Sequence, residues 1–170
     1  MLFRSMGYRV EAISDSEDCP AAHHADRVHV GAFDDARKLE QIAGSLDAIT
    51  FEFENVPVEA ARAMQQAVPV RPAPDVLFTT QDRAREKAFL TDHGFACAPH
   101  RVVRSRDELH AAVAALGLPA VLKTAAFGYD GKGQRKLEAA ADVDPAWASL
   151  GPGDCVLEGW IDFDCEISVV

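Results

Sequence analysis

Three short strand-like runs recur through the first 70 residues. Residues 8–13 alternate apolar and polar side chains, as a half-buried strand does. Residues 27–30 and 48–53 form two more short runs of the same kind. The pattern therefore predicts three strands, each only four to six residues long.

Two helices are expected between and after these strands. Asp34 can cap a helix that runs to about Ser45, and Pro57 suits the first turn of a helix that runs to about Ala67. Strands interleaved with helices predict an α/β unit with a parallel, doubly wound sheet. Such a sheet normally opens with a strand, a Gly-rich turn and a helix. The sequence before residue 8 shows no such unit, so we expect a partial sheet that lacks its first strand.

The pattern changes in the second half of the chain. Residues 69–74 contain three prolines, which end regular structure. A helix is predicted from Arg83 to Asp92, with Asp82 near its start and Gly94 near its end. Beyond it we expect an α+β unit with strands at 100–104, 119–123, 134–137, 154–160 and 165–170, and helices near 105–117 and 142–150.

Composition and charge narrow the possible functions. The net charge is −10, from 27 acidic and 17 basic residues, which disfavours nucleic-acid binding because phosphates must be neutralised by Lys and Arg. No apolar run approaches the roughly 18 residues of a membrane-spanning helix. The four cysteines form no C-x-x-C pair and are interpreted as free thiols in a reducing cytoplasm.

The most informative stretch is a lysine followed by a glycine-rich loop. Lys123 ends an apolar strand, and residues 128–133 then contain three glycines before a return strand begins. Glycines let backbone N–H groups approach an anion, and Lys123 and Lys132 add positive charge beside them. The pattern favours a phosphate-binding hairpin, although it differs from the Walker and dinucleotide motifs. A solvated Gly-rich hairpin is the alternative.

Charged residues elsewhere could serve the same ligand. Glu158 ends a strand whose backbone could read an adenine edge, and the carboxylate of Glu166 could hold ribose hydroxyls; ordinary surface acids are the alternative. Arg83 and Lys87 are four residues apart on one helix and carry like charges, which favours an external anion as the partner of Arg83.

Two further carboxylates end the third predicted strand. Glu52 and Glu54 flank one residue, so alternation puts them on the same face. Open α/β sheets bind ligands at the carboxyl ends of their strands. A substrate contact is therefore one reading, and a solvated strand end is the other.

Taken together, these stretches resemble the ATP-grasp superfamily and, within it, the 5-(carboxyamino)imidazole ribonucleotide synthetases of purine biosynthesis. The likeness covers essentially the whole chain. It rests on residues 51–56 (FEFENV), 70–72 (VRP), 81–83 (QDR), 118–124 (LPAVLKT), 128–134 (GYDGKGQ), 158–160 (EGW), 163–164 (FD) and 166–168 (EIS).

The resemblance implies an ATP-grasp ligase that uses ATP, bicarbonate and Mg²⁺ to carboxylate 5-aminoimidazole ribonucleotide, giving 5-carboxyaminoimidazole ribonucleotide, ADP and phosphate. It also implies catalytic roles for Tyr129, Asp130 and Lys132, and substrate contacts for Glu52 and Glu54. The residues implied to bind ATP are Arg83, Lys123, Gly128, Tyr129, Asp130, Gly131, Lys132, Gly133, Gln134, Glu158, Gly159, Trp160, Ile161 and Glu166.

The same resemblance implies how the chain is divided. Residues 1–75 would be a partial pre-ATP-grasp, substrate-binding domain, 76–95 a helical linker, 96–161 the ATP-grasp small lobe and 162–170 the start of the large lobe. The chain would then be an internal segment, inactive alone, of a cytoplasmic homodimer whose metal ligands follow residue 170. Two alternatives stay open: another ATP-grasp carboxylate–amine ligase, or an inert folded module.

Overall fold

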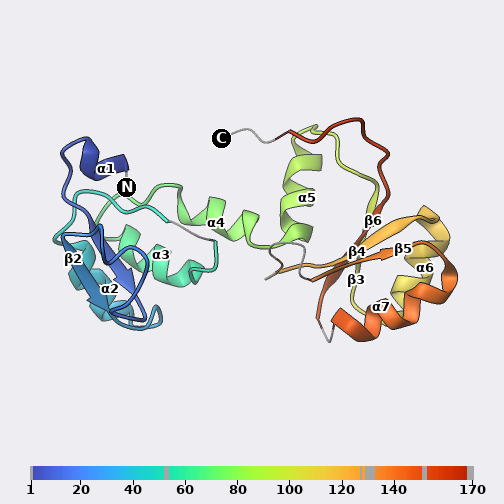
Figure 1. The fold of residues 1–170 in the computed structure, drawn as a ribbon, viewed down its shortest axis with the longest axis horizontal. Helices are drawn as coiled ribbons and strands as arrows, with labels where there is room; N and C mark the ends of the chain where they lie inside the picture. Colours follow the sequence, from blue (N-terminus) through green and yellow to red (C-terminus); the bar gives the residue numbers. More distant parts are fainter. Residues whose placement is uncertain (1, 52–53, 127, 129–132, 151–152, 168–170) are drawn as a thin grey trace. The chain divides into compact units, whose positions relative to one another are not determined.

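The chain forms two units, described one at a time. Figure 1 shows the computed structural model, which describes residues 2–51, 54–126, 128, 133–150 and 153–167. Unit 1 comprises Met1–Phe78, and unit 2 comprises Thr79–Val170. Each has its own cluster of buried apolar side chains.

Unit 1 is an α/β arrangement around parallel strands. Its elements are α1 (Leu2–Ser5), β1 (Glu11–Ser14), β2 (Arg27–Val30), α2 (Ala36–Ala43), α3 (Val58–Gln65) and α4 (Pro74–Thr80), the last of which continues into unit 2. β1 and β2 pair in parallel, with Glu11 opposite Arg27, as predicted for a doubly wound sheet. Leu39 of α2 and Met64 of α3 are among the side chains that fill the core of this unit.

The third predicted strand is only partly formed. Within residues 48–51, Ile49 makes a single parallel bridge to Val70: its N–H donates to the Pro69 carbonyl at 2.9 Å, and its carbonyl accepts from Arg71 at 2.8 Å. Residues 52 and 53 lie outside the described part of the chain. The prediction of a continuous strand over 48–51 is wrong, because the backbone meets its partner at Ile49 alone.

Two boundaries in unit 1 also differ from the prediction. β1 begins at Glu11 and not at residue 8, because the Val10 N–H donates to the Asp26 carboxylate at 2.8 Å. Helix α2 is capped by Asp35, whose carboxylate accepts from the Lys38 N–H, and not by Asp34. The helix predicted with Pro57 in its first turn is α3, which begins one residue later, at Val58, with Pro57 as its N-cap residue.

Unit 2 is an antiparallel sheet with helices on both faces. Its remaining elements are α5 (Arg83–Asp92), β3 (His100–Val103), α6 (Arg106–Leu116), β4 (Ala120–Thr124), β5 (Gln134–Leu137), the 3₁₀ turn η1 (Ala140–Asp142), α7 (Val143–Leu150) and β6 (Cys155–Gly159). The strand order is β3-β6-β4-β5. These four strands were predicted, and α6 begins after Ser105, whose hydroxyl accepts from the Glu108 N–H.

The two faces of this sheet differ in character. Leu122 and Leu157 point to the face covered by α6 and α7 and are completely buried there. Figure 1 shows α5 on the opposite side of the strands from α7. Since side chains alternate along a strand, the neighbours of these leucines face α5. The sheet therefore has one apolar face and one that carries polar side chains.

Two predictions near the C-terminus need correction. Residues 165–167 form no strand, and Ile167 is 80% exposed, so their alternating pattern buries no apolar face; residues 168–170 lie outside the described chain. Helix α7 begins at Val143 and not at Asp142, because the Asp142 carboxylate instead accepts from the N–H groups of Glu138 and Ala139. These contacts also hold the pKa of Asp142 below its usual value.

A substitution at Gly133 tests the turn that leads into β5. Gly133 has φ +74°, and an added Cβ would lie 2.6 Å from the Thr124 hydroxyl oxygen. Gly133→Ala should therefore destabilise unit 2 by more than the roughly 1–2 kcal/mol that a left-handed conformation alone costs. Urea unfolding followed by tryptophan fluorescence reports on unit 2, which holds both tryptophans, Trp147 and Trp160.

Gly94→Ala is the matched control for this variant. Gly94 has φ +79°, but an added Cβ there would meet nothing within 4 Å. It should show the conformational cost without the clash, and Thr124→Ala should recover part of the loss in Gly133→Ala. Equal destabilisation by the two alanines would contradict the close approach at the turn.

Candidate functional site

The polar face of the unit 2 sheet brings Lys123 and Glu158 together. Leu122 pairs with Leu157 on the core face, so the residues beside them, Lys123 and Glu158, point to the other face. In the register, Lys123 lies opposite Val156 and Glu158 lies opposite Val121, which makes the lysine and the glutamate diagonal neighbours. Strand pairing thus fixes the position of this charged pair.

A second lysine reaches the same carboxylate from helix α5. Lys123 Nζ lies 3.0 Å from Glu158 Oε2, and Lys87 Nζ lies 3.2 Å from Glu158 Oε1. The side chains are 26% exposed for Lys123, 14% for Lys87 and 11% for Glu158. The carboxylate is therefore largely removed from water and is bridged by two ammonium groups.

The two lysines keep Glu158 ionised despite its burial. Burial raises the pKa of a carboxyl group, but the hydrogen bond from Lys123, followed by the charges of Lys123 and Lys87, outweighs it. The pKa of Glu158 consequently lies below its usual value. His100 of β3 is the cross-strand neighbour of Glu158 on this face, with its Nδ1 3.0 Å from the Ala98 carbonyl oxygen.

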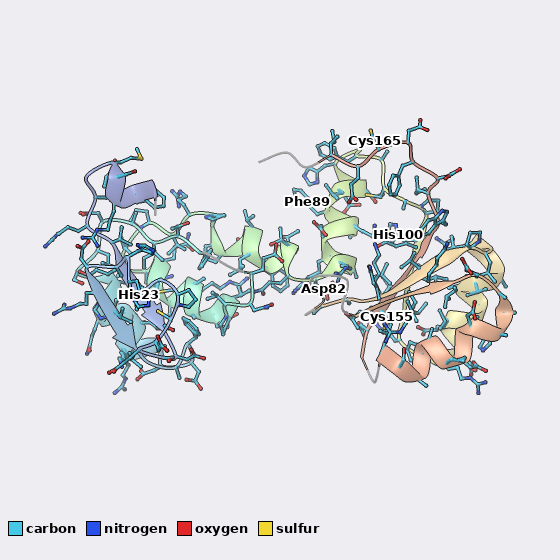
Figure 2. All side chains as sticks on the ribbon, viewed as in Figure 1. His23, Asp82, Phe89, His100, Cys155 and Cys165 are labelled. Atoms are coloured by element: carbon cyan, nitrogen blue, oxygen red, sulfur yellow. The ribbon has the colours of Figure 1, made fainter. Side chains whose placement is uncertain are left out.

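Arg83 lies at the start of α5, beside the glycine-rich segment. Asp82 caps this helix, and Figure 2 shows it at the foot of α5. The guanidinium of Arg83 donates to the Thr124 carbonyl at 2.7 Å and to the Gly128 carbonyl at 3.3 Å. The backbone N–H of Arg83 donates to the Ala125 carbonyl at 2.8 Å. Arg83 thus ties α5 to the segment that follows β4.

These contacts correct the argument from like charges along α5. Lys87 is not a solvated neighbour of Arg83, because it pairs with Glu158. Arg83 in turn finds acceptors inside unit 2. Its charge is not neutralised by carbonyl groups, so its role as a phosphate ligand stays a prediction.

The glycine-rich segment begins and ends between paired strands. Lys123 lies opposite Gln134 in the β4–β5 ladder, and the Thr124 N–H donates to the Gly133 carbonyl at 2.8 Å. Gly128, Gly133 and Gln134 are therefore held close to the end of β4. The predicted residues Tyr129, Asp130, Gly131 and Lys132 lie outside the described chain.

The end of β6 carries the residues predicted to hold adenine. The N–H of Gly159 donates to the Pro99 carbonyl at 2.8 Å, and that of Trp160 donates to Pro119 at 3.1 Å. The ammonium of Lys136 lies 4.2 Å from the centroid of the Trp160 ring. Two backbone donors are thus already engaged, so any adenine edge would be read by other groups of this segment, such as those of Ile161.

The remaining predicted residues come from other parts of the chain. Glu166 is exposed on the segment after β6, which is neither helix nor strand. Glu54 is exposed in unit 1, ahead of α3, while the charged cluster belongs to unit 2. Glu52 lies outside the described chain. The roles of these three residues stay predictions.

Sequence reasoning missed Lys87 as a member of the site. Its only local signal is the spacing of four residues from Arg83, which puts both cations on one side of the helix. Within the residues that the structure describes, no three His, Cys, Asp or Glu side chains gather as a metal ion would require. The cluster is cationic and suits an anion.

Comparisons with known proteins place this arrangement in a class. Residues 2–81 match the family model of the ribonucleotide synthetase preATP-grasp domain, and residues 88–170 match that of the ATP-grasp domain. Together with the antiparallel sheet and its lysine-bearing polar face, these matches define an ATP-grasp protein.

The most similar proteins specify the family. The chain is 40% identical over 166 residues to an N5-carboxyaminoimidazole ribonucleotide synthase of Brucella melitensis, covering 96% of this chain and 46% of the relative. A solved ADP complex of an N5-carboxyaminoimidazole ribonucleotide synthetase superposes with a TM-score of 0.88 at 34% identity, covering 95% of this chain and 43% of that one. The Staphylococcus aureus enzyme with ADP gives 0.87 at 30% identity, covering 93% and 42%.

The chain belongs to the N5-carboxyaminoimidazole ribonucleotide synthase family, which confirms the resemblance drawn from its motifs. It spans about half the length of the curated relatives that it matches.

The paired state of Glu158 predicts a pH dependence of stability. The pKa of Glu158 is lower in the folded chain than in the unfolded chain. The ionised carboxylate therefore stabilises the fold above the unfolded pKa of about 4.3. This stabilisation is lost as the pH falls through the folded pKa. Wild type should therefore exceed Glu158→Gln in stability at neutral pH, and the gap should shrink below about pH 4. Urea unfolding of unit 2 between pH 3 and 7, followed by tryptophan fluorescence, measures this gap.

Glu138→Gln controls for the loss of a surface carboxylate, since Glu138 pairs with Lys136 and its side chain is 71% exposed. Such exposed pairs contribute little. A gap between wild type and Glu158→Gln that stayed constant with pH would contradict the ion pair.

Proposed function

We propose that the chain forms the nucleotide-phosphate site of an ATP-dependent ligase that carboxylates 5-aminoimidazole ribonucleotide in purine biosynthesis. The observation that carries the proposal is Lys123 at the end of β4, beside the glycine-rich segment and Arg83. The names of the relatives, and the ADP bound in two solved structures of similar synthetases, support this choice.

The proposed reaction has two bond-forming steps. A bicarbonate oxygen attacks the γ-phosphorus of ATP, so the bond to ADP breaks and carboxyphosphate forms. The amine of the ribonucleotide then attacks the carboxyl carbon, the bond to phosphate breaks, and 5-carboxyaminoimidazole ribonucleotide results. Charge accumulates on phosphate oxygens in the first step, which is where fixed cations stabilise the transition state.

The residues of unit 2 have separate roles in this proposal. Lys123 projects from a paired strand, so its ammonium reaches the phosphates from a rigid support. Arg83 lies at the start of α5, next to the same segment, and adds a planar cation suited to phosphate oxygens. The segment from Glu158 to Ile161 would take the adenine, Glu166 the ribose, and Glu54 of unit 1 the ribonucleotide.

Magnesium belongs to the proposed reaction but not to the described part of this site. The described carboxylate nearest Lys123 is Glu158, and both of its oxygens face lysine ammonium groups. That donor set does not fit a divalent cation, which prefers several free oxygen ligands. We therefore place Mg²⁺ outside the described residues.

The proposal extends to the division of the chain and its setting. The chain comprises a pre-ATP-grasp domain over 1–75, a linker over 76–95, a small lobe over 96–161 and the start of a large lobe from 162. The family-model matches over 2–81 and 88–170 support a division into two domains. The four cysteines are free thiols, which suits a reducing cytoplasm. No helix within the described residues could span a membrane. A homodimer stays a prediction.

ADP release by the full-length protein tests the function as a whole. Turnover should require bicarbonate and 5-aminoimidazole ribonucleotide together. Turnover with a different acid and amine would instead establish another ATP-grasp ligase, and ATP binding without turnover on any such pair would favour an inert module. Either result would overturn the proposed substrate.

Lys123→Ala tests the phosphate site itself. A charge-assisted contact contributes roughly 1.5–3 kcal/mol, so its loss should weaken ATP use by about tenfold to a hundredfold at 1.4 kcal/mol per decade. The measurement is steady-state kinetics of the full-length variant over a range of ATP concentrations. The control is Lys38→Ala. Lys38 lies in unit 1, where its ammonium donates to the Val30 carbonyl. Unchanged ATP dependence in Lys123→Ala would leave the solvated-hairpin interpretation standing.

A further inference from the structure

Helix α5 contacts the sheet through a charged side chain. None of its residues is fully buried, and its Phe89 is 48% exposed. Its inward contact is Lys87, which pairs with Glu158 of β6. Replacing a buried ion pair by apolar residues is often neutral or stabilising, so this pair is weak as a device for stability alone. Its location beside Lys123 suggests another purpose.

The three charged groups have unequal access to solvent. Lys87 and Glu158 are 14% and 11% exposed, while Lys123 is 26% exposed. Each oxygen of the carboxylate faces a different lysine. An ammonium has three donors, so Lys123 can donate one to Glu158 and keep two for another acceptor. The group nearest to solvent is thus the one with donors to offer.

The sum of charges depends on Lys87. Two ammonium groups and one carboxylate leave the cluster with a net charge of +1. Without Lys87, Glu158 and Lys123 would form a neutral pair, and both carboxylate oxygens would be free to turn toward Lys123. A nucleotide phosphate would then meet the Lys123 ammonium when its charge is already neutralised by Glu158.

We propose that Lys87 is a positioning residue that holds Glu158, so that the Lys123 ammonium remains available to the phosphates of a nucleotide. The inference rests on the proposed function, because it deepens the role assigned there to Lys123. Lys87 does not touch the nucleotide in this account. It acts through the carboxylate that both lysines share.

Binding of ATP and adenosine to full-length variants tests the proposal. Lys87→Met keeps the length of the side chain and removes its charge. Because one unit charge is lost near the phosphates, ATP affinity should fall by about tenfold, while adenosine affinity should not change. Lys87→Arg should restore ATP binding. Lys38→Met, which changes the net charge equally without touching Glu158, should bind ATP as wild type does.

A second substitution separates positioning from folding. In the Lys87→Met background, Glu158→Gln removes the carboxylate that would otherwise neutralise Lys123. The double variant should therefore bind ATP more tightly than Lys87→Met alone, although it lacks both partners of the ion pair. A merely structural ion pair predicts no such recovery, so a double variant as weak as Lys87→Met would overturn the proposal.

Titration of Glu158 by carboxyl NMR gives a readout that needs no nucleotide. The groups facing it are Lys87 from α5, Lys123 from β4 and His100 from β3. Loss of Lys87 should raise the pKa of Glu158, and an unchanged value would overturn the proposal. Wild type that binds no ATP would defeat the proposed function and this inference with it, whereas equal ATP binding by wild type and Lys87→Met would defeat the inference alone.

Discussion

A carboxylate withdrawn from water needs compensating charge, and the arrangement of the unit 2 site follows from how Glu158 obtains it. Desolvation alone would favour the neutral acid. Lys123 on the adjacent strand and Lys87 on helix α5 instead keep it ionised. The same two contacts place a lysine at the end of β4 and fasten α5 against the sheet. Charge balance at one residue thus links a strand, a helix and a candidate ligand site.

The sheet can support this site because its two faces are specialised. Leu122 and Leu157 fill the core beneath α6 and α7, and alternation gives the opposite face to Lys123 and Glu158. A register shift of one residue would exchange the leucines with the charges. The apolar core therefore fixes the position of the polar groups, and the core and the candidate site use different faces of the same strands.

Local patterns in the sequence were sufficient to predict much of unit 2. The apolar strand runs and the helix expected near 105–117 correspond to β4, β6 and α6, since each signal acts within a few residues. The third strand of unit 1 and the segment at 165–167 were overpredicted. Strand formation there depends on a distant partner, and alternation alone does not supply one: Ile49 meets Val70 at a single bridge.

The residues of the candidate site also differ in whether the sequence alone reveals them. Lys123 and the glycines can be recognised in the sequence, because a lysine at a strand end and a Gly-rich turn are local features. Lys87 cannot, because its partner lies on a strand far along the chain and only the fold brings them together. The like charge of Arg83 and Lys87 favours an external anion in the sequence, yet Lys87 pairs with Glu158 and Arg83 donates to backbone carbonyls.

This internal pairing also explains how the site can hold several cations close together. Carbonyl groups accept from Arg83 without cancelling its charge, and Glu158 cancels only one of the two lysine charges. The three cations and one carboxylate therefore keep a positive excess within an acidic chain of net charge −10. Attraction of a polyphosphate to such a chain has to be local, since the overall field would repel it. A local cluster of cations in which the two lysines share one carboxylate, Glu158, meets that requirement.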